Sequence, residues 1–346
     1  MKDLIVRGEV YSGKRMISGT YSISKDRFVD SSVRADVRGT LLKGPINFHT
    51  HLGDAFIKRE PQGDIKQIVG PKGFKMTELQ SASIMEIRKY IRKSVDFMKD
   101  QGTAAFFDFR ESGVLGLKSV PNLKGISGFF MTRPSNKKEI EPLLEQSAGF
   151  GLSSLSDYDF DFLLDLSVRS HKRKKLFAIH FSEDEREDVK KLAELKPDFI
   201  IHCLEASDDD IDFLKQMDVP IVITPRSNLF HGKRPDYSKF FRKGLNVLLG
   251  TDNAFITEPG IMDEAAFLYR YQRKLGRLSP EEVLATVTDN PREEISRLGL
   301  RMDQETYLLY PDEELTAYQI LTRPNFYERV KLTVKDERIN FFPRKH

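Results

Sequence analysis

Beyond residue 44, short apolar runs alternate with longer stretches in which apolar residues recur every three or four positions. Each run holds six or seven residues between turn formers, which is typical of buried strands and too short for helices. The runs cover residues 45–51, 103–109, 125–131, 148–153, 176–182, 198–204, 219–224 and 246–252. Eight such strands with helices between them predict an α/β fold, a (β/α)8 TIM barrel over residues 44–300. An open doubly wound sheet would alternate too, but no glycine-rich nucleotide-binding motif follows the first run.

The stretches between the runs are predicted to be amphipathic helices with charged outer faces. Residues 82–102 are the clearest case, because their apolar residues share one helical face and Gly102 follows as a C-terminal stop. The acidic stretch 183–195 is also predicted to be helical. Three aspartates at 208–210 suit a helix N-terminus, where negative charge opposes the helix dipole favourably.

Both ends of the chain follow a different pattern, with short β-like pieces broken by glycine and serine. Residues 1–43 hold three such pieces, and strand-like alternation returns after residue 300, with a hairpin expected around residues 336–337. We therefore expect the two ends, residues 1–43 and 301–346, to pair as one small β domain that flanks the barrel.

Composition narrows the class of protein. Of the 346 residues, 39% are hydrophobic and 31% charged, as in a soluble globular protein. No apolar run approaches the ~20 residues that cross a bilayer, and the N-terminus lacks the apolar core of a signal peptide. We expect a cytoplasmic protein without a membrane partner. The net charge of +3 does not call for nucleic acid, so the expected partners are a small-molecule substrate and a second copy of the chain in a homodimer.

Metal-ligand side chains gather at the ends of the predicted strands. The first strand ends with His49 and His51, the fifth with His180, the sixth with His202 and the eighth with Asp252. Barrel enzymes carry their chemistry at these ends, and the period of two points His49 and His51 to the same side. Burying several imidazoles without partners costs about 1–3 kcal/mol each. The pattern therefore predicts a metal site. A single cysteine, Cys203, excludes a cysteine-cluster zinc site and an intrachain disulfide.

Glu183 lies three residues beyond His180, past the end of the fifth predicted strand. A carboxylate there is placed to move protons without occupying a coordination position. A surface glutamate at the start of the acidic helix is the alternative for this residue taken alone.

Six segments resemble the motifs of the amidohydrolase superfamily, in particular its deaminase/chlorohydrolase branch with the cytosine, guanine and adenosine deaminases. They are HTHLGDA, AIHFSED, IIHCLEAS, TPRSNLF, LLGTDNA and DNPREEISRLGL, and they follow the order of that branch between residues 44 and 300. Two features depart from the branch. Residues 57–75 form a polar loop in place of a helix-rich insertion, with a lid as one interpretation, and the C-terminal Gly-Lys-x-Ala-Asp signature is missing.

The resemblance implies a metal-dependent hydrolase that deaminates a purine-, pyrimidine- or pterin-like ring with release of ammonia. Its metal ligands would be His49, His51, His180 and Asp252, holding one divalent ion, with Zn²⁺ favoured over Fe²⁺ or Mn²⁺. The fourth predicted strand lacks the bridging lysine of two-metal members. Glu183 would shuttle a proton, His202 would orient the attacking water, and Asp252 would also accept that water's proton.

Several points stay open at the level of the sequence. The same site could hydrolyse an amide or amidine C–N bond or remove chloride, and a metal-binding barrel without turnover is a further alternative. Arg110, Arg226 and Asn228 follow predicted strands and are our candidate substrate contacts, with helix caps or surface ion pairs as alternatives. Asp54 is expected either to cap a turn or to touch the substrate.

Overall fold

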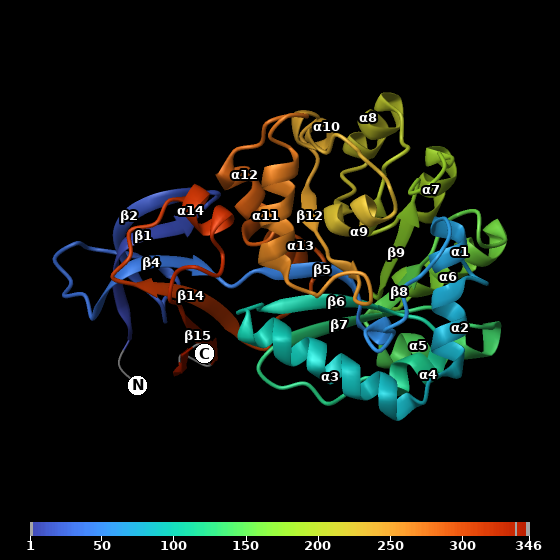
Figure 1. Ribbon diagram of the computed structural model, residues 1–346, viewed down its shortest axis with the longest axis horizontal. Helices are drawn as coiled ribbons and strands as arrows, with labels where there is room; N and C mark the ends of the chain where they lie inside the picture. The colour runs from blue at the N-terminus through green and yellow to red at the C-terminus, as the bar shows by residue number, and fades with distance from the viewer. Residues whose placement is uncertain (1–2, 336–337, 344–346) are drawn as a thin grey trace.

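The computed structural model describes residues 3–335 and 338–343. Its larger sheet has nine strands in the order β12-β11-β10-β9-β8-β7-β6-β5-β13, paired in parallel (Figure 1). The strands are β5 (Ile46–His51), β6 (Ala105–Arg110), β7 (Ser127–Thr132), β8 (Gly149–Leu152), β9 (Leu176–Phe181), β10 (Phe199–His202), β11 (Ile221–Ile223), β12 (Val247–Leu249) and β13 (Asp252–Asn253). Each of the eight predicted apolar runs contains a strand.

The sheet curls until its two ends meet. The backbone N–H of Gly250, just past β12, donates to the carbonyl of Ile223 in β11 at 3.0 Å. The next N–H, that of Thr251, donates to the carbonyl of His49 in β5 at 2.9 Å. Strands β12 and β13 are therefore two halves of one eighth strand, and the predicted TIM barrel is confirmed.

Helices cover the outside of this barrel (Figure 1). They are α1 (Ile65–Val69), α2 (Phe74–Ser81), α3 (Ile84–Asp100), α4 (Gly113–Lys118), α5 (Ile140–Gln146), α6 (Phe160–Lys172), α7 (Val189–Leu195), α8 (Asp208–Gln216), α9 (Pro225–Phe230), α10 (Ser238–Arg242), α11 (Ile261–Tyr271), α12 (Pro280–Ala285) and α13 (Asp289–Arg297). Short 3₁₀ turns lie at Leu52–Asp54 and Lys137–Glu139.

The prediction that residues 183–195 form one helix is wrong in its first half. Helix α7 begins only at Val189, where the side chain of Asp188 accepts a hydrogen bond from the N–H of Lys190. Before it, Glu187 accepts a 2.8 Å hydrogen bond from the N–H of Ser182. Since this carboxylate reaches back to the strand end, residues 183–188 form a loop beside the barrel mouth.

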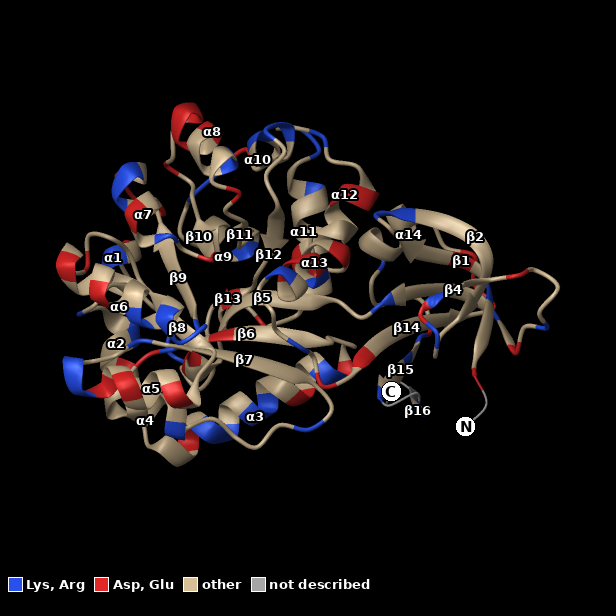
Figure 2. Cartoon of the chain, turned by 180° about the vertical axis from the view of Figure 1, so that it is seen from behind, with Lys and Arg blue, Asp and Glu red and all other residues tan. Residues whose placement is uncertain are grey.

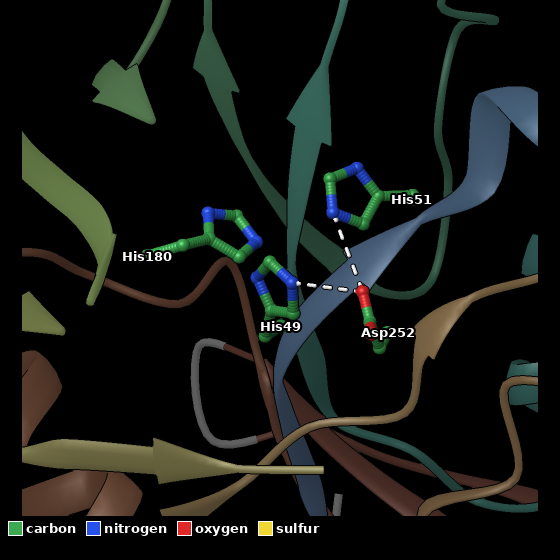
Figure 3. Close-up of side chains that lie close together, drawn as sticks. All are labelled: His49, His51, His180 and Asp252. Carbon is green, nitrogen blue, oxygen red and sulfur yellow. Dashed lines mark hydrogen bonds and ion pairs between the residues drawn. The ribbon is translucent and has the colours of Figure 1, made fainter. Parts of the chain in front are cut away.

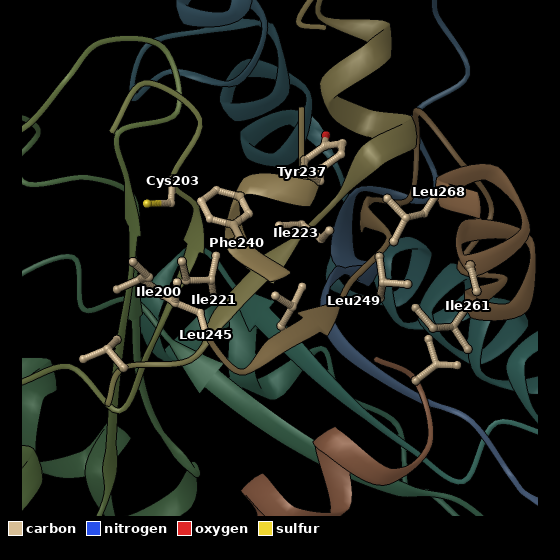
Figure 4. Close-up of a cluster of buried hydrophobic side chains, with 14 of the residues drawn as sticks. Ile200, Cys203, Ile221, Ile223, Tyr237, Phe240, Leu245, Leu249, Ile261 and Leu268 are labelled. Atoms are coloured by element: carbon tan, nitrogen blue, oxygen red, sulfur yellow. The ribbon is translucent and has the colours of Figure 1, made fainter. Parts of the chain in front are cut away.

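Side chains that alternate along the barrel strands pack into two hydrophobic cores, one outside the barrel and one inside it. Ile200, Ile221, Ile223 and Leu249 point outward and pack with residues of α10 and α11, such as Phe240 and Leu268 (Figure 4). Their neighbours Ile201, Val222 and Leu248 point inward and join the aromatic filling of the barrel. Strands that are buried on both faces explain why the sequence shows continuous apolar runs rather than alternation.

A β-bulge in β5 sets the position of the first histidine. The pairing of β5 with β6 shifts register between Asn47 and Thr50, so β5 carries one extra residue. As a result, Phe48 lies inside the barrel and stacks on Phe107 with ring centroids 4.1 Å apart. His49 follows directly and also faces the barrel mouth.

The two ends of the chain form a second sheet of seven strands beside the barrel, in the order β16-β15-β14-β4-β1-β2-β3 (Figure 1). Strand β14 pairs antiparallel with β4, which joins residues after 300 to residues before 44. The elements are β1 (Ile5–Ser12), β2 (Arg15–Ser22), β3 (Arg27–Val29), β4 (Val37–Lys43), β14 (Glu305–Pro311), α14 (Ala317–Thr322), β15 (Val330–Lys335) and β16 (Arg338–Pro343). Strands β15 and β16 pair antiparallel as expected, although the turn at 336–337 lies outside the described residues. The division into two domains stays a prediction.

Charged residues lie mainly on the covering helices, with both signs interspersed, while the barrel strands are largely uncharged (Figure 2). Within residues 3–335 and 338–343, no helix is both long and apolar enough to cross a membrane.

Candidate active site

Four predicted ligand residues come together at the mouth of the barrel (Figure 3). His49 and His51 extend from β5, His180 from β9 and Asp252 from β13. One possible ligand atom from each lies within 4.8 Å of the others, and all four side chains are buried. Strand ends that are far apart in the sequence thus converge on one point, as the sequence predicts.

Hydrogen bonds to the ring nitrogens that face away from the cluster fix the tautomers of His51 and His180. Nδ1 of His180 lies 2.7 Å from the carbonyl of Leu152. Nδ1 of His51 lies 2.8 Å from Oε1 of Glu111 and 3.2 Å from the carbonyl of Phe109. Because these acceptors require a proton on Nδ1, the Nε2 atoms of His51 and His180 keep their lone pairs, as metal-ligating histidines do.

The two carboxylate oxygens of Asp252 have different partners, the histidines on one side and Ser227 on the other. The Oδ1 atom lies 3.2 Å from Nε2 of His49 and 3.4 Å from Nε2 of His51, while Oδ2 accepts a 2.6 Å hydrogen bond from Ser227. The residue adopts φ of +63°, a conformation that L-residues rarely take. This turn at the end of the barrel strand directs the carboxylate inward, at a cost of about 1–3 kcal/mol.

Electrostatics keeps these groups in the forms that bind a cation. Burial and the nearby Lys75 ammonium lower the pKa of His51 to about 4, and burial holds the pKa of His180 well below its usual value. Burial opposes ionisation of Asp252, but the hydrogen bond from His49 and the adjacent imidazoles hold the pKa of this carboxylate well below 3.8. The imidazoles of His51 and His180 are therefore favoured in their neutral form, and the Asp252 carboxylate beside them in its ionised form.

The donor set fits one divalent ion. Ligand atoms of a tetrahedral site with bonds near 2.0–2.1 Å lie about 3.3–3.4 Å apart, close to the 3.2 and 3.4 Å that separate Asp252 Oδ1 from the two histidines of β5. Nδ1 of His49 is buried without a hydrogen-bond partner among the described residues. Three imidazoles with one carboxylate suit Zn²⁺ or Fe²⁺ better than Mg²⁺.

Glu183 and His202 form a second pair above this cluster. Oε1 of Glu183 lies 3.2 Å from Nε2 of His202, and both residues also lie close to Asp252. Burial raises the pKa of Glu183 well above 4.5, and the carboxylates of Asp252 and Asp184 raise it further. Burial lowers the pKa of His202 to about 3. Burial and neighbouring carboxylates thus favour the protonated form of Glu183, which faces an imidazole that burial favours in its neutral form. This arrangement suits a general acid beside a hydrogen-bond donor.

Asn228 fixes the tautomer of that imidazole. Its Oδ1 accepts a 2.8 Å hydrogen bond from the hydroxyl of Tyr237, so its Nδ2 faces Nδ1 of His202 at 3.2 Å. Since an amide N–H donates, Nδ1 of His202 accepts and Nε2 carries the proton. The imidazole N–H therefore points toward Glu183 and the centre of the site.

A cavity of about 1230 Å³ opens from the cluster. His51, His180, Glu183, His202 and Asp252 line its base. Its walls come from residues 64–76 around α1 and α2, from residues 153–160 after β8 and from the loop 183–188. The prediction of an irregular loop over residues 57–75 is wrong, because the segment contains α1 and the first turn of α2. Its residues from 64 on border the cavity, and motion as a lid stays a prediction.

Sequence reasoning missed two charged groups in this cavity, Lys75 and Arg133. Lys75 of α2 and Glu111, just past β6, are buried and joined by a 2.5 Å ion pair. Lys75 and His51 hold the pKa of Glu111 well below 4.5 although burial opposes this. Arg133, just past β7, also lines the cavity. Arg133 could have been found as a charged residue directly after a strand, whereas Lys75 carries no such signal.

The structure gives protein partners to the three candidate substrate contacts. Arg110 is buried and donates to Gly116 and Ser119, Arg226 pairs with the buried Glu264, and Asn228 bonds His202. None of the three is among the residues that line the cavity in the described chain. Their contact with substrate stays a prediction that these partners do not favour.

The structure gives Asp54 partners within the protein. Its carboxylate accepts hydrogen bonds from Asn253 at 2.8 Å and from the N–H of Phe255 at 3.2 Å. It therefore links β13 and the residues just after it to the turn that follows β5. A role of Asp54 in capping that turn or in touching the substrate stays a prediction.

The fold and the site define a hydrolase of the deaminase type, and the comparisons with known proteins agree. A protein of Archaeoglobus fulgidus that is named as an aminohydrolase is 34% identical to this chain over 269 residues. The match covers 75% of this chain and 78% of that protein. A 5-methylthioadenosine/S-adenosylhomocysteine deaminase of Caldicellulosiruptor saccharolyticus is 25% identical over 309 residues, 79% of this chain and 71% of that protein. No family model matches the chain.

Solved structures share the whole fold. The Helicobacter pylori aminofutalosine deaminase matches with a TM-score of 0.72, 13% identity and coverage of 97% of this chain and 100% of that one. A Xanthomonas campestris adenosine deaminase with bound zinc matches with a TM-score of 0.71 and 13% identity, and the match covers 99% of this chain and 93% of that one. The chain belongs to the amidohydrolase superfamily, and the predicted class of enzyme is confirmed.

Proposed function

We propose that the protein is a metal-dependent aminohydrolase that deaminates a nitrogen heterocycle of purine, pyrimidine or pterin type. His49, His51, His180 and Asp252 would hold one divalent ion, with zinc as our first choice. The observation that carries the proposal is the position of Glu183 beside His202 and Asp252, because a site that only binds metal has no need for a further carboxyl 3.2 Å from an imidazole nitrogen.

When held by these residues, a divalent ion would lower the pKa of a water molecule to about 7 and so make hydroxide available at neutral pH. Nε2–H of His202 is placed to donate a hydrogen bond to the oxygen that attacks the ring carbon. Glu183 holds a proton on the same side and is placed to give it to a ring nitrogen or to the leaving amino group. A C–O bond would form and the exocyclic C–N bond would break. Where Glu183 protonates the ring nitrogen, Asp252 would take the proton of the attacking oxygen and pass it to the amino group, which leaves as ammonia.

The comparisons support the reaction class more than the substrate. The Caldicellulosiruptor relative is named for two adenine nucleosides, and the fold neighbours include adenosine, guanine and 5-methylcytosine deaminases. The cavity has room for a ring with a substituent, since its 1230 Å³ exceeds the ~300–1,000 Å³ of ordinary ligand pockets.

A panel of amino-substituted purines, pyrimidines, pterins and nucleosides, read out as released ammonia, tests the proposal. Metal analysis of the purified protein is expected to give about one ion per chain. Glu183→Gln is expected to reduce ammonia release by about 10²–10⁴-fold while the metal stays bound. Full activity of metal-free protein would contradict the proposal, and a new carboxylate or chloride in place of ammonia would indicate amide hydrolysis or dechlorination. Cytoplasmic location and a homodimer stay predictions.

A further inference from the structure

Lys75 is a buried lysine at the edge of the site. It is 4% exposed, and it extends from the first turn of α2, at the end of the polar segment 57–75. Its Nζ lies 2.5 Å from Oε1 of Glu111 and 3.7 Å from Oδ2 of Asp54. Because an ammonium taken out of water is costly without a charged partner, these contacts determine where its side chain lies.

The oxygen that Lys75 contacts is also the one that faces a metal-ligand histidine. Oε1 of Glu111 lies 2.8 Å from Nδ1 of His51, whereas the carbonyl of Phe109 lies 3.2 Å from the same nitrogen. The chain of contacts thus runs from α2 through one carboxylate oxygen to the outer nitrogen of His51. A carboxylate in this position orients the ring and makes its other nitrogen a stronger donor.

We propose that Lys75 is a positioning residue, which acts through Glu111 to fix His51 and thereby makes the 57–75 segment part of the metal site. The inference rests on the proposed metal site and extends it beyond the four ligands. Without the ammonium, Glu111 would be a buried carboxylate with only His51 beside it within ion-pair distance, and it would rotate toward water. His51 would then keep only the longer contact to the Phe109 carbonyl.

Zinc affinity of the purified protein, measured by competition with a chromogenic chelator, tests the inference without any substrate. Lys75→Met is expected to weaken zinc binding by about 10–100-fold, the usual effect of removing support from a ligand histidine. Arg59→Met is the matched control. It removes an exposed ion pair with Glu78 from the same segment, outside the cavity, and is expected to leave zinc affinity unchanged.

A double-mutant cycle separates a role through Glu111 from general destabilisation. In a Glu111→Gln background, Lys75→Met is expected to change zinc affinity by less than about twofold, because the contact through which it acts is gone. An equal loss in both backgrounds, or wild-type affinity of Lys75→Met, would overturn the inference. Lys75→Arg keeps the charge and serves if Lys75→Met does not fold, with affinity expected closer to wild type than that of Glu111→Gln. Wild-type protein that binds no zinc would instead contradict the proposed metal site itself.

Discussion

Ser227 donates a 2.6 Å hydrogen bond to Oδ2 of Asp252, the oxygen that points away from His49 and His51. Ser227 lies in the first turn of α9, so this short helix supports the carboxylate from behind. Ser227→Ala is therefore expected to weaken metal binding by about 10–100-fold while the fold is kept. Chelator competition measures the affinity, and circular dichroism checks the fold. Unchanged affinity would show that the backbone turn at Asp252 suffices to hold its carboxylate.

The amide of Asn228 decides which nitrogen of His202 carries the proton. Asn228→Asp replaces a donor by an acceptor at 3.2 Å from Nδ1, so the proton moves to Nδ1 and Nε2 loses its N–H. By analogy with tautomer reversal in a catalytic triad, kcat is expected to fall by about 10²–10⁴-fold with metal content unchanged.

Tyr237→Phe is expected to have a smaller effect than Asn228→Asp on the same chain of hydrogen bonds. It removes the 2.8 Å hydrogen bond to the Asn228 amide, and we expect a loss in kcat of about fivefold, from about 1 kcal/mol. Equal activity of Asn228→Asp and wild type would show that His202 does not act through Nε2–H.

A substitution of Arg110 tests whether this residue stabilises the fold or contacts the substrate. Its guanidinium is buried, donates to Ser119 at 3.0 Å and lies 3.7 Å from the buried Asp108 carboxylate. Arg110→Met would leave that carboxylate without its cation, so we expect a loss of about 3 kcal/mol in unfolding free energy and an unchanged KM. Gly53→Ala should act in the same direction, because its Cβ would overlap the guanidinium. A KM raised tenfold with unchanged stability would restore Arg110 as a substrate contact.

The strands and the ligand cluster were predictable for one physical reason. Parallel strands buried on both faces must be continuous apolar runs, and their ends must meet at one rim, so a polar residue that closes such a run belongs to the mouth. His180 and Asp252 could be placed together in this way although 72 positions separate them. The pairing of the two chain ends followed from their shared strand pattern.

What could not be predicted depends on contacts between distant segments. The bulge that turns both Phe48 and His49 inward is a register shift against β6, which no local pattern encodes. The ion pair of Lys75 joins two segments 36 positions apart, and Lys75 lies in a short helix whose sequence shows no amphipathic periodicity. Helix α9 did carry a signal, since Pro225 at its first position favours a helix start, but the segment was interpreted only as a strand end.

Asp26 provides a pH test in the sheet built from both chain ends. Its carboxylate accepts hydrogen bonds from Tyr21 at 2.6 Å and Tyr307 at 2.5 Å and pairs with Lys43 at 2.6 Å. Burial works against ionisation, but these donors lower the pKa of Asp26 below its ordinary 3.8. A lowered pKa stabilises the fold above the unfolded-state value, and this contribution is lost as the pH falls through the folded-state value.

Asp26→Asn is therefore expected to lower the free energy of unfolding by about 1 kcal/mol at pH 7, a modest value because the side chain is 45% exposed. The difference between the variant and wild type should shrink as the pH falls below about 4. Urea unfolding of both proteins at pH 7, 5, 4 and 3 measures it, with Asp30→Asn as a control, since the Asp30 carboxylate accepts a hydrogen bond from the N–H of the nearby Ser32. If the difference in unfolding free energy stays constant down to pH 3, the substitution destabilises the fold through the shape of the amide and not through the loss of charge.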